Sequence, residues 1–322
     1  MRVSGITYFT PQKRSFRKPL KIVLLAVVLV LFLIAGISGY TAWLITHPDR
    51  TEPGSIPGGL DGASEVTFND SSGKYSLNGW FFAAEGGTGV IITVHGHGGN
   101  RLIFRDATSK FIGEMQSSGW SVLAFDLRNS GNSGGNISSL GYNERNDVLS
   151  AVNYVKKLDY ENIVLLGCST GASASLFASA LSPDVDAVVA DTPYHDMRTF
   201  LYDTLRTYTR LPSFPFDFAV PVMVNLFAGI DSYKIAAGGS DTIAKRDLPV
   251  LFIHSSRDSL IPIAASKKLL SLYSVGSARC RLWETDATGH ASSFVQLEQS
   301  YVLNVSRFLM EIFGDNSLSD EP

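Results

Sequence analysis

The chain has 322 residues, of which 45% are apolar and 18% are charged, and its formal net charge is −3. This composition is typical of a folded globular protein, and the charge gives no reason to expect a nucleic-acid partner. Two cysteines, Cys168 and Cys280, are too few for a disulfide framework, and we expect both to be buried free thiols.

An apolar segment near the N-terminus predicts a membrane anchor. Residues 22–46 carry no charge, and as a helix they would span about 37 Å, enough to cross a hydrocarbon core of about 30 Å. The residues before this segment include several Lys and Arg but no Asp or Glu. We therefore expect residues 1–21 to be a basic cytoplasmic tail. The rest of the chain would then be extracytoplasmic. A cleaved signal peptide is the alternative, although its apolar region is usually about 7–15 residues long.

The segment at 47–64 is rich in Pro and Gly and has no apolar period, which predicts a linker. Short apolar runs then alternate with helical patterns up to residue 314, and a flexible tail is expected at 315–322. We predict strands at 65–68, 74–82, 89–94, 121–125, 163–166, 187–190, 250–253 and 279–283, and helices at 104–118, 143–158, 170–182, 264–272 and 294–313. This alternation predicts an α/β domain whose mostly parallel sheet has helices on both faces.

One stretch, at about 194–246, interrupts the alternation. It is rich in aromatic residues and contains Pro212, Pro215 and Pro221. We interpret it as a helical lid over the carboxyl ends of the strands, where α/β sheets bind ligands. A purely structural helical excursion is the alternative.

The sequence Gly167-Cys168-Ser169-Thr170-Gly171 follows a predicted strand and precedes a predicted helix of small residues. In that setting a G-x-S-x-G motif forms a sharp turn that exposes the serine above the sheet. The glycines leave room for this turn, and the helix N-terminus favours negative charge. Ser169 is therefore the candidate nucleophile. Cys168 is not, because Leu166 and not glycine stands two residues before it.

A serine hydroxyl needs a base, and the base needs an orienting carboxylate. His290 lies in a loop of small residues after the last predicted strand, at the same sheet edge as Ser169, and is the expected base. Asp258 follows the strand at 250–253 and is the expected carboxylate, with Asp191 as its competitor. His254 is expected to have a structural role. The order Ser169, Asp258, His290 is the one that this type of site requires.

The glycine-rich loop at 95–100 reads His-Gly-His-Gly-Gly-Asn. Its glycines let the backbone approach a substrate, so we expect the N–H groups of His97 and Thr170 to form an oxyanion hole. Metal binding by His95 and His97 is the alternative, but two histidines without further ligands make a poor zinc signature. No metal and no cofactor are expected.

Five motifs carry a resemblance to the α/β-hydrolases: the loop at 95–100, the D-x-R loop at 125–135, the serine motif, the Asp258 loop and the His290 loop. Within that superfamily the chain is similar to Bem46-like and acyl-protein-thioesterase-like hydrolases, several of which are membrane-anchored. Two positions depart from the family pattern. Asn129 stands where glycine is usual, and His97 is bulkier than many residues at its position.

The resemblance implies a cofactor-independent serine hydrolase with the triad Ser169, Asp258 and His290. The aromatic insertion and the anchor favour a small or lipid-like ester or thioester with an apolar acyl group. A serine peptidase could use the same triad, with Glu114, Glu144 or Arg198 available to hold a peptide terminus. A catalytically silent binding module is the third reading, since a fold does not fix function.

Overall fold

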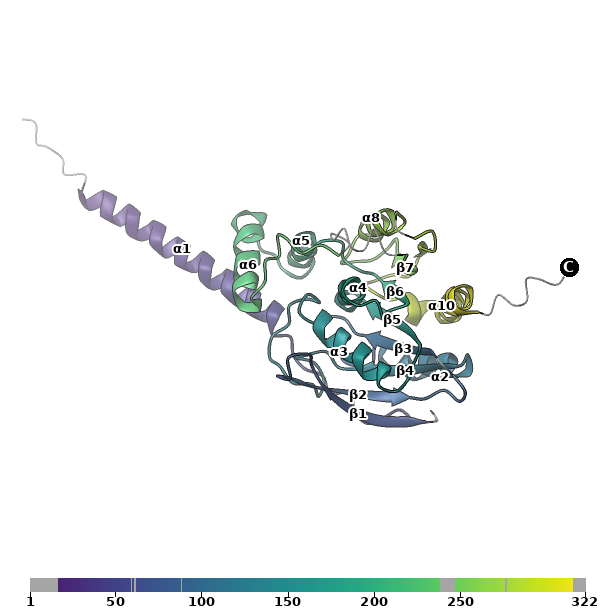
Figure 1. The fold of residues 1–322 in the computed structure, drawn as a ribbon. Coiled ribbons are helices and arrows are strands. Elements are labelled where there is room, and N and C mark those ends of the chain that lie inside the picture. The colour runs from purple at the N-terminus through teal and green to yellow at the C-terminus, as the bar shows by residue number, and fades with distance from the viewer. Residues whose placement is uncertain are drawn as a thin grey trace, which may run out of the picture.

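The computed structural model describes residues 17–58, 60, 62–87, 89–237, 247–275 and 277–314. The predicted cytoplasmic tail up to residue 16, the end of the insertion at 238–246 and the C-terminal tail lie outside the described residues. A long helix near the N-terminus projects from an α/β domain (Figure 1).

Within the described residues, eight strands form one sheet in the order β1-β2-β4-β3-β5-β6-β7-β8. The strands are β1 (Ala63–Asn69), β2 (Ser76–Phe82), β3 (Gly89–Val94), β4 (Trp120–Phe125), β5 (Asn162–Cys168), β6 (Ala187–Asp191), β7 (Val250–Ser255) and β8 (Arg281–Thr285). Strand β2 pairs antiparallel with β1 and β4, and all other pairs are parallel. The predicted α/β sheet is therefore confirmed, with strand ends shifted by a few residues.

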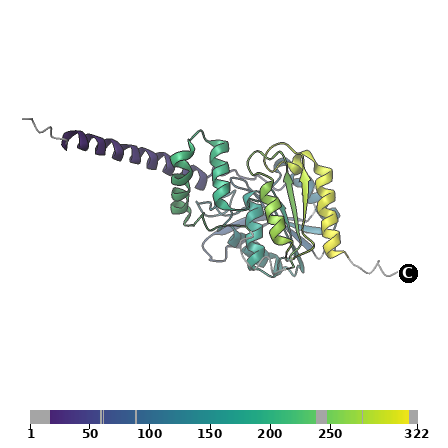
Figure 2. The same cartoon turned by 90° about the horizontal axis from the view of Figure 1, so that it is seen from above.

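Both faces of the central strands are buried. Strand β3 shows this in its alternation: Val90, Ile92 and Val94 face one apolar core, and Ile91 faces the other. The helices are η1 (Arg105–Ala107), α2 (Thr108–Ser117), α3 (Arg145–Lys156), α4 (Thr170–Leu181), α8 (Ala264–Tyr273), α9 (Ser293–Gln296) and α10 (Glu298–Phe313). Figure 2 shows the helices around the twisted sheet, with α10 at the end of the molecule that lies away from the anchor. The single helix expected at 294–313 is instead broken at Leu297, whose backbone leaves the helical region.

Helix α1 (Arg17–Thr46) is long and apolar enough to cross a membrane. Its described part starts at Arg17, five residues before the expected segment, so Arg17, Lys18 and Lys21 are also helical. The insertion contributes α5 (Met197–Tyr208) and α6 (Ser213–Ala228). Helix α6 packs against the C-terminal part of α1 and crosses it (Figure 1). The small residues Ser38 and Ala42 are buried on α1, which allows this close approach.

The Pro/Gly segment after α1 lies against the domain. Arg50 donates hydrogen bonds to the side-chain oxygen of Asn129 and to the carbonyl oxygens of Ser133 and Gly135. The side-chain amide of Asn100 donates to the carbonyl oxygen of Thr51 at 2.9 Å. This part of the predicted linker therefore fixes the end of α1 beside the loops that follow β3 and β4.

Candidate active site

Ser169 occupies the sharp turn between β5 and α4. Its backbone has φ 55° and ψ −123°, a strained conformation for a residue with a Cβ. A Cβ on Gly167 would lie 2.4 Å from the carbonyl oxygen of Gly171. One on Gly171 would lie 2.3 Å from the carbonyl oxygens of Val94 and His95. The two glycines are thus required because α4 starts directly against β3 and β5.

His290 reaches Ser169 from the loop after β8. Its Nε2 lies 2.7 Å from the Ser169 hydroxyl oxygen, and its Nδ1 lies 3.0 Å from both carboxylate oxygens of Asp258. An imidazole that donates from Nδ1 to a carboxylate presents an unprotonated Nε2 to the hydroxyl. The loop geometry therefore suits proton transfer from Ser169 to His290.

Asp258 is held in an ionised state by its surroundings. It accepts hydrogen bonds from the backbone N–H groups of Leu260, Ile261 and Ala291 at 2.8–3.1 Å. Burial by itself would raise the pKa of Asp258, but hydrogen bonding and attraction to His290 and the backbone donors lower it on balance. A charged carboxylate at this position can stabilise a protonated imidazole.

The competing carboxylate, Asp191, does not bond to His290 within the described residues. Its side chain accepts a hydrogen bond from the hydroxyl of Thr192 at 2.8 Å and faces the thiol of Cys168. Burial raises the pKa of Asp191 to about 6, although the Thr192 bond opposes this. The geometry therefore favours Asp258 over Asp191 as the partner of His290.

The glycine-rich loop lies directly over the serine. A Cβ on Gly96 would come within 3.2 Å of the Ser169 Cβ, so the backbone passes very close to the nucleophile. Among the hydrogen bonds of the described residues, the N–H groups of His97 and Thr170 have no protein acceptor. Both are the donors that the sequence predicted for an oxyanion, and both remain candidates on this geometry.

His95 supports the loop from inside. Its Nδ1–H donates to the Gly96 carbonyl oxygen at 2.8 Å, and its Nε2 accepts from the Leu127 N–H at 3.1 Å. Burial lowers the pKa of His95, which keeps the ring neutral as these bonds require. Because both ring nitrogens are occupied, His95 ties the loop after β3 to the loop after β4.

An ion pair that the sequence analysis did not single out reinforces the same connection. Arg101 and Asp126 are almost fully buried and lie 2.6 Å apart, and Asp126 also accepts from the Asn132 N–H. Asp126 is the first residue of the D-x-R motif, so the motif itself was the available signal. Asn129 in that motif has φ 59°, which explains why glycine is usual there and why asparagine is tolerated.

Other predicted residues have structural roles. His254 is buried and bonds to the Ser266 hydroxyl and the Ile261 carbonyl, as expected for a structural histidine. Cys168 is a buried free thiol. Cys280 is also free but is partly exposed and precedes β8, so the expectation that it is buried inside a strand was wrong.

The residues proposed to anchor a peptide terminus are not gathered around Ser169. Glu144 is buried, and its carboxylate accepts from the Ser139 N–H and hydroxyl and from the Gly141 N–H. Glu114 is an exposed residue of α2, and Arg198 on α5 bonds to the Tyr202 hydroxyl. The carboxylate of Glu144 is thus already used by its own loop.

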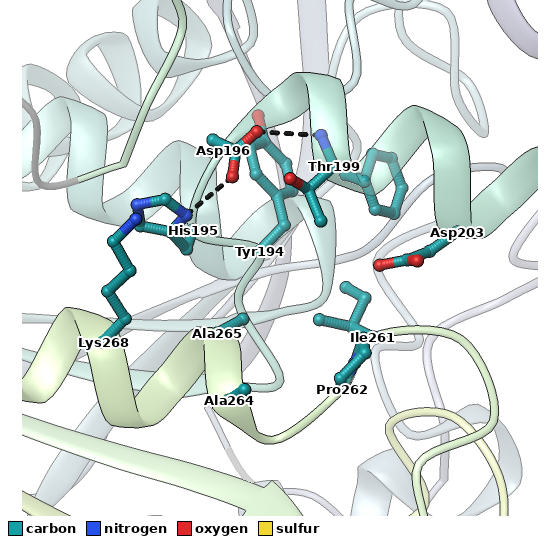
Figure 3. A pocket seen from close by; sticks show the side chains of 11 residues that line it. Tyr194, His195, Asp196, Thr199, Asp203, Ile261, Pro262, Ala264, Ala265 and Lys268 are labelled. Atoms are coloured by element: carbon teal, nitrogen blue, oxygen red, sulfur yellow. Dashed lines mark hydrogen bonds and ion pairs between the residues drawn. The ribbon is translucent and has the colours of Figure 1, made fainter. Parts of the chain in front are cut away.

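A cavity of about 240 Å³ lies between α5 and α8. Figure 3 shows Lys268 extending toward His195, which is hydrogen-bonded to Asp196, while Ile261 and Pro262 form part of the opposite wall. Neither Ser169 nor His290 lines this cavity. It adjoins the Asp258 loop but is separate from the hydroxyl that would react.

Comparisons with known proteins agree on the family. A family model described as alpha/beta hydrolase fold matches residues 89–230. The chain is 30% identical over 239 residues to the uncharacterized protein YqkD of Bacillus subtilis, which covers 73% of this chain and 75% of that protein. It is also 25% identical over 196 residues to the lysophosphatidylserine lipase ABHD12 of Xenopus tropicalis, covering 57% of this chain and 46% of that lipase.

A solved structure shows the same fold. The esterase Pf2001 of Pyrococcus furiosus superimposes with a TM-score of 0.69 at 22% identity, covering 84% of this chain and 99% of that esterase. At this level of identity the likeness concerns the fold alone.

Proposed function

The chain belongs to the α/β-hydrolase family, and we propose that it hydrolyses a carboxylic ester or thioester through an acyl-enzyme on Ser169. The observation that carries the proposal is the continuous hydrogen-bonded chain from Ser169 through His290 to Asp258. A serine becomes a strong nucleophile only when a positioned base accepts its proton. The neighbouring N–H groups of His97 and Thr170 would stabilise the charge that develops on the carbonyl oxygen.

The proposed reaction has two halves. Ser169 Oγ attacks the carbonyl carbon while His290 Nε2 accepts the hydroxyl proton, and the resulting oxyanion is held by the two backbone donors. When this intermediate collapses, the bond to the alcohol or thiol breaks and His290 protonates the leaving group. Water then attacks the acyl-enzyme, with His290 again as base, and releases the acid.

An ester with an apolar acyl group is the substrate class that we propose. The matched relative named as a lysophosphatidylserine lipase supports an ester. The aromatic insertion, with α5 and α6, supplies apolar surface on the same domain. We regard the insertion as the lid of the site.

The proposed topology is a single-pass anchor at 22–46 with a cytoplasmic N-terminus, and a catalytic domain at 65–314 on the opposite side of the membrane. The basic residues that precede the apolar segment support this orientation. Protease added to intact cells should then degrade the domain. A domain that is protected until the cells are lysed would show the opposite orientation, with the domain in the cytoplasm.

Activity-based labelling tests the proposed reaction. The full chain in detergent should react with a fluorophosphonate at Ser169 and hydrolyse p-nitrophenyl esters faster than aminoacyl amides. Ser169→Ala should abolish labelling and lower ester turnover by about 10⁴-fold or more. Cys168→Ser is the matched control for a change in the same turn, and it should still be labelled. Normal turnover by Ser169→Ala would reject the proposal, and preference for amides would favour a peptidase.

A further inference from the structure

Helix α6 carries a row of exposed apolar side chains. Phe214, Phe218, Val222 and Leu226 follow one another at intervals of four residues, and their exposed fractions are 88%, 68%, 40% and 72%. Phe214 has a non-helical backbone and precedes the regular part of α6. In that regular part, the spacing places Phe218, Val222 and Leu226 on one face of the helix. The opposite face, with Phe216, Val220 and Val224, is buried in the domain. A row of large apolar residues that is open to water calls for a partner surface.

We propose that the exposed face of α6 lies in the lipid bilayer, in the leaflet on the side of the catalytic domain, next to the point where α1 leaves the membrane. The partner is the lipid itself. The proposal depends on α1 crossing the membrane and does not depend on the reaction at Ser169.

The position of α6 on α1 supports this depth. A hydrocarbon core of about 30 Å is crossed by about 20 helical residues, so a span that starts at Ile22 ends near Thr41. The residues that α1 buries, Ser38, Ala42 and Thr46, lie at this boundary. Because α6 packs on this part of α1, it lies at the level of the membrane surface.

Aromatic residues of α1 mark the same level. Tyr40 and Trp43 are 65% and 47% exposed, and such amphipathic rings favour the boundary between acyl chains and headgroups. Helix α6 crosses α1 there instead of continuing alongside it (Figure 1). A crossing helix of this kind can lie along the membrane plane with one face in the lipid, as interfacial helices do.

The polar side chains of α6 do not oppose this placement. Asp217 is paired with Arg206 of α5 at 3.6 Å, and the side-chain oxygen of Asn225 accepts the Ser232 N–H at 2.9 Å. Both side chains are thus turned toward other parts of the protein. The exposed row itself contains no charged residue, so burying it in lipid leaves no charge without a partner.

The same arrangement brings the candidate active site close to the membrane. The carbonyl oxygen of Thr46, at the end of α1, accepts the Ser138 N–H, and the Ser138 hydroxyl lies 3.4 Å from the His97 ring. Arg50, just beyond, bonds to Asn129. The two departures from the family pattern, His97 and Asn129, therefore both lie where the anchor meets the domain.

Fluorescence of labelled single sites tests the proposal in the full chain, reconstituted in phosphatidylcholine vesicles. The label is the environment-sensitive dye NBD, attached to Phe218→Cys or Leu226→Cys in a Cys280→Ser background, since Cys168 is buried. Leu303→Cys is the matched control, because Leu303 is also exposed and belongs to α10, a helix at the end of the molecule away from α1 (Figure 2). Val30→Cys in α1 reports membrane insertion.

The expected result is a blue-shifted emission at residues 218 and 226, and at least about twofold stronger quenching by nitroxide-labelled lipids than at residue 303. Nitroxides near the headgroup should quench these two sites more than nitroxides at the end of the acyl chain. Equal quenching at 218, 226 and 303 would overturn the proposal. A blue shift without quenching by lipid would also overturn it, because a second copy of the chain would then cover α6. If lipid nitroxides did not quench the dye at residue 30, α1 would not cross the membrane, and the proposal would fail with it.

Discussion

The backbone N–H of Ser138 donates a hydrogen bond of 2.8 Å to the carbonyl oxygen of Thr46, the last residue of α1. Residues 92 positions apart in the sequence thereby join the apolar helix α1 to the loop next to His97. The segment that follows α1 continues this attachment through Arg50 and Asn100.

Arg50→Ala should loosen that attachment. Arg50 is exposed, so its hydrogen bonds to Asn129 and Ser133 are partly screened and we expect a loss of about 1 kcal/mol in the free energy of unfolding. Cleavage after Glu52 by a glutamate-specific protease should become faster. Lys74→Ala, in an exposed turn, is the control and should leave the cleavage rate unchanged. Equal rates for both variants would show that the segment is not held by Arg50.

Asp258→Asn should lower kcat for an ester by about 10⁴-fold while the protein stays folded, because an amide cannot hold the required tautomer of His290. Asp191→Asn is the matched control, since Asp191 bonds to Thr192 and not to His290. It should lower kcat by less than about tenfold. Steady-state kinetics on a soluble p-nitrophenyl ester measures both. A larger loss of kcat for Asp191→Asn than for Asp258→Asn would show that Asp191 is the carboxylate that orients His290.

Asp191 should make stability depend on pH. Burial raises its pKa in the folded protein to about 6, from an ordinary value of 3.8. The folded state therefore binds a proton more tightly than the unfolded state, and this stabilisation is complete below pH 4 and is lost as the pH rises through 6. The loss is up to about 3 kcal/mol.

The measurement is the melting temperature of the full chain and of Asp191→Asn, in detergent, at pH 4 and pH 7. The variant cannot titrate at this position. The melting temperature of the variant, relative to that of the natural chain, should therefore be several degrees higher at pH 7 than at pH 4. A difference that does not change with pH would mean that the carboxyl of Asp191 ionises normally.

Gly171→Ala should destabilise the domain by about 3 kcal/mol or more, because the new methyl group would meet the carbonyl oxygens of Val94 and His95 at 2.3 Å. Gly113→Ala is the control. Gly113 lies within α2, and a Cβ there would make only an ordinary contact of 3.6 Å with Leu60. This change should therefore raise the free energy of unfolding by about 0.5–1 kcal/mol, because alanine favours the helix. Thermal unfolding of both variants gives the comparison, and similar melting temperatures would contradict the tight packing of α4 on β3.

Introducing charge on α6 should separate two activities. The double variant Phe218→Glu with Leu226→Glu should lower turnover of a long-chain ester in vesicles by about tenfold, because each carboxylate is costly to place in lipid. Turnover of a soluble short-chain ester should change little. Leu303→Glu with Met310→Glu on α10 is the control and should leave both rates unchanged. Equal loss of both activities would point to a folding defect instead.

Much of the fold was predictable because its elements have local signatures. The buried strands read as continuous apolar runs, and their alternation with helical segments indicated a parallel sheet. The break at Leu297 had no such signature, since the residues on both sides of it suit a helix. The start of β2 was also misplaced by two residues, because Lys74 and Tyr75 belong to the turn that Asp70 organises through its side chain.

The candidate triad was also within reach of the sequence. Ser169 has a glycine two positions before it and another two positions after it. Asp258 and His290 follow strands that end at the same sheet edge. The choice between Asp258 and Asp191 was different, because both follow parallel strands. Only the path of each loop decides which carboxylate meets the imidazole, and that path depends on contacts such as the Ile261 and Ala291 N–H groups.

The sequence by itself determined the apolar helix near the N-terminus, the α/β fold and the chemical groups of the candidate site, because periodicity and turn residues act over short distances along the chain. Only the tertiary structure decided that α6 packs on α1 and that the Pro/Gly segment is bound to the loops beside Ser169. Those contacts join residues far apart in sequence, such as Thr46 and Ser138, and no local pattern specifies which distant surfaces bury each other.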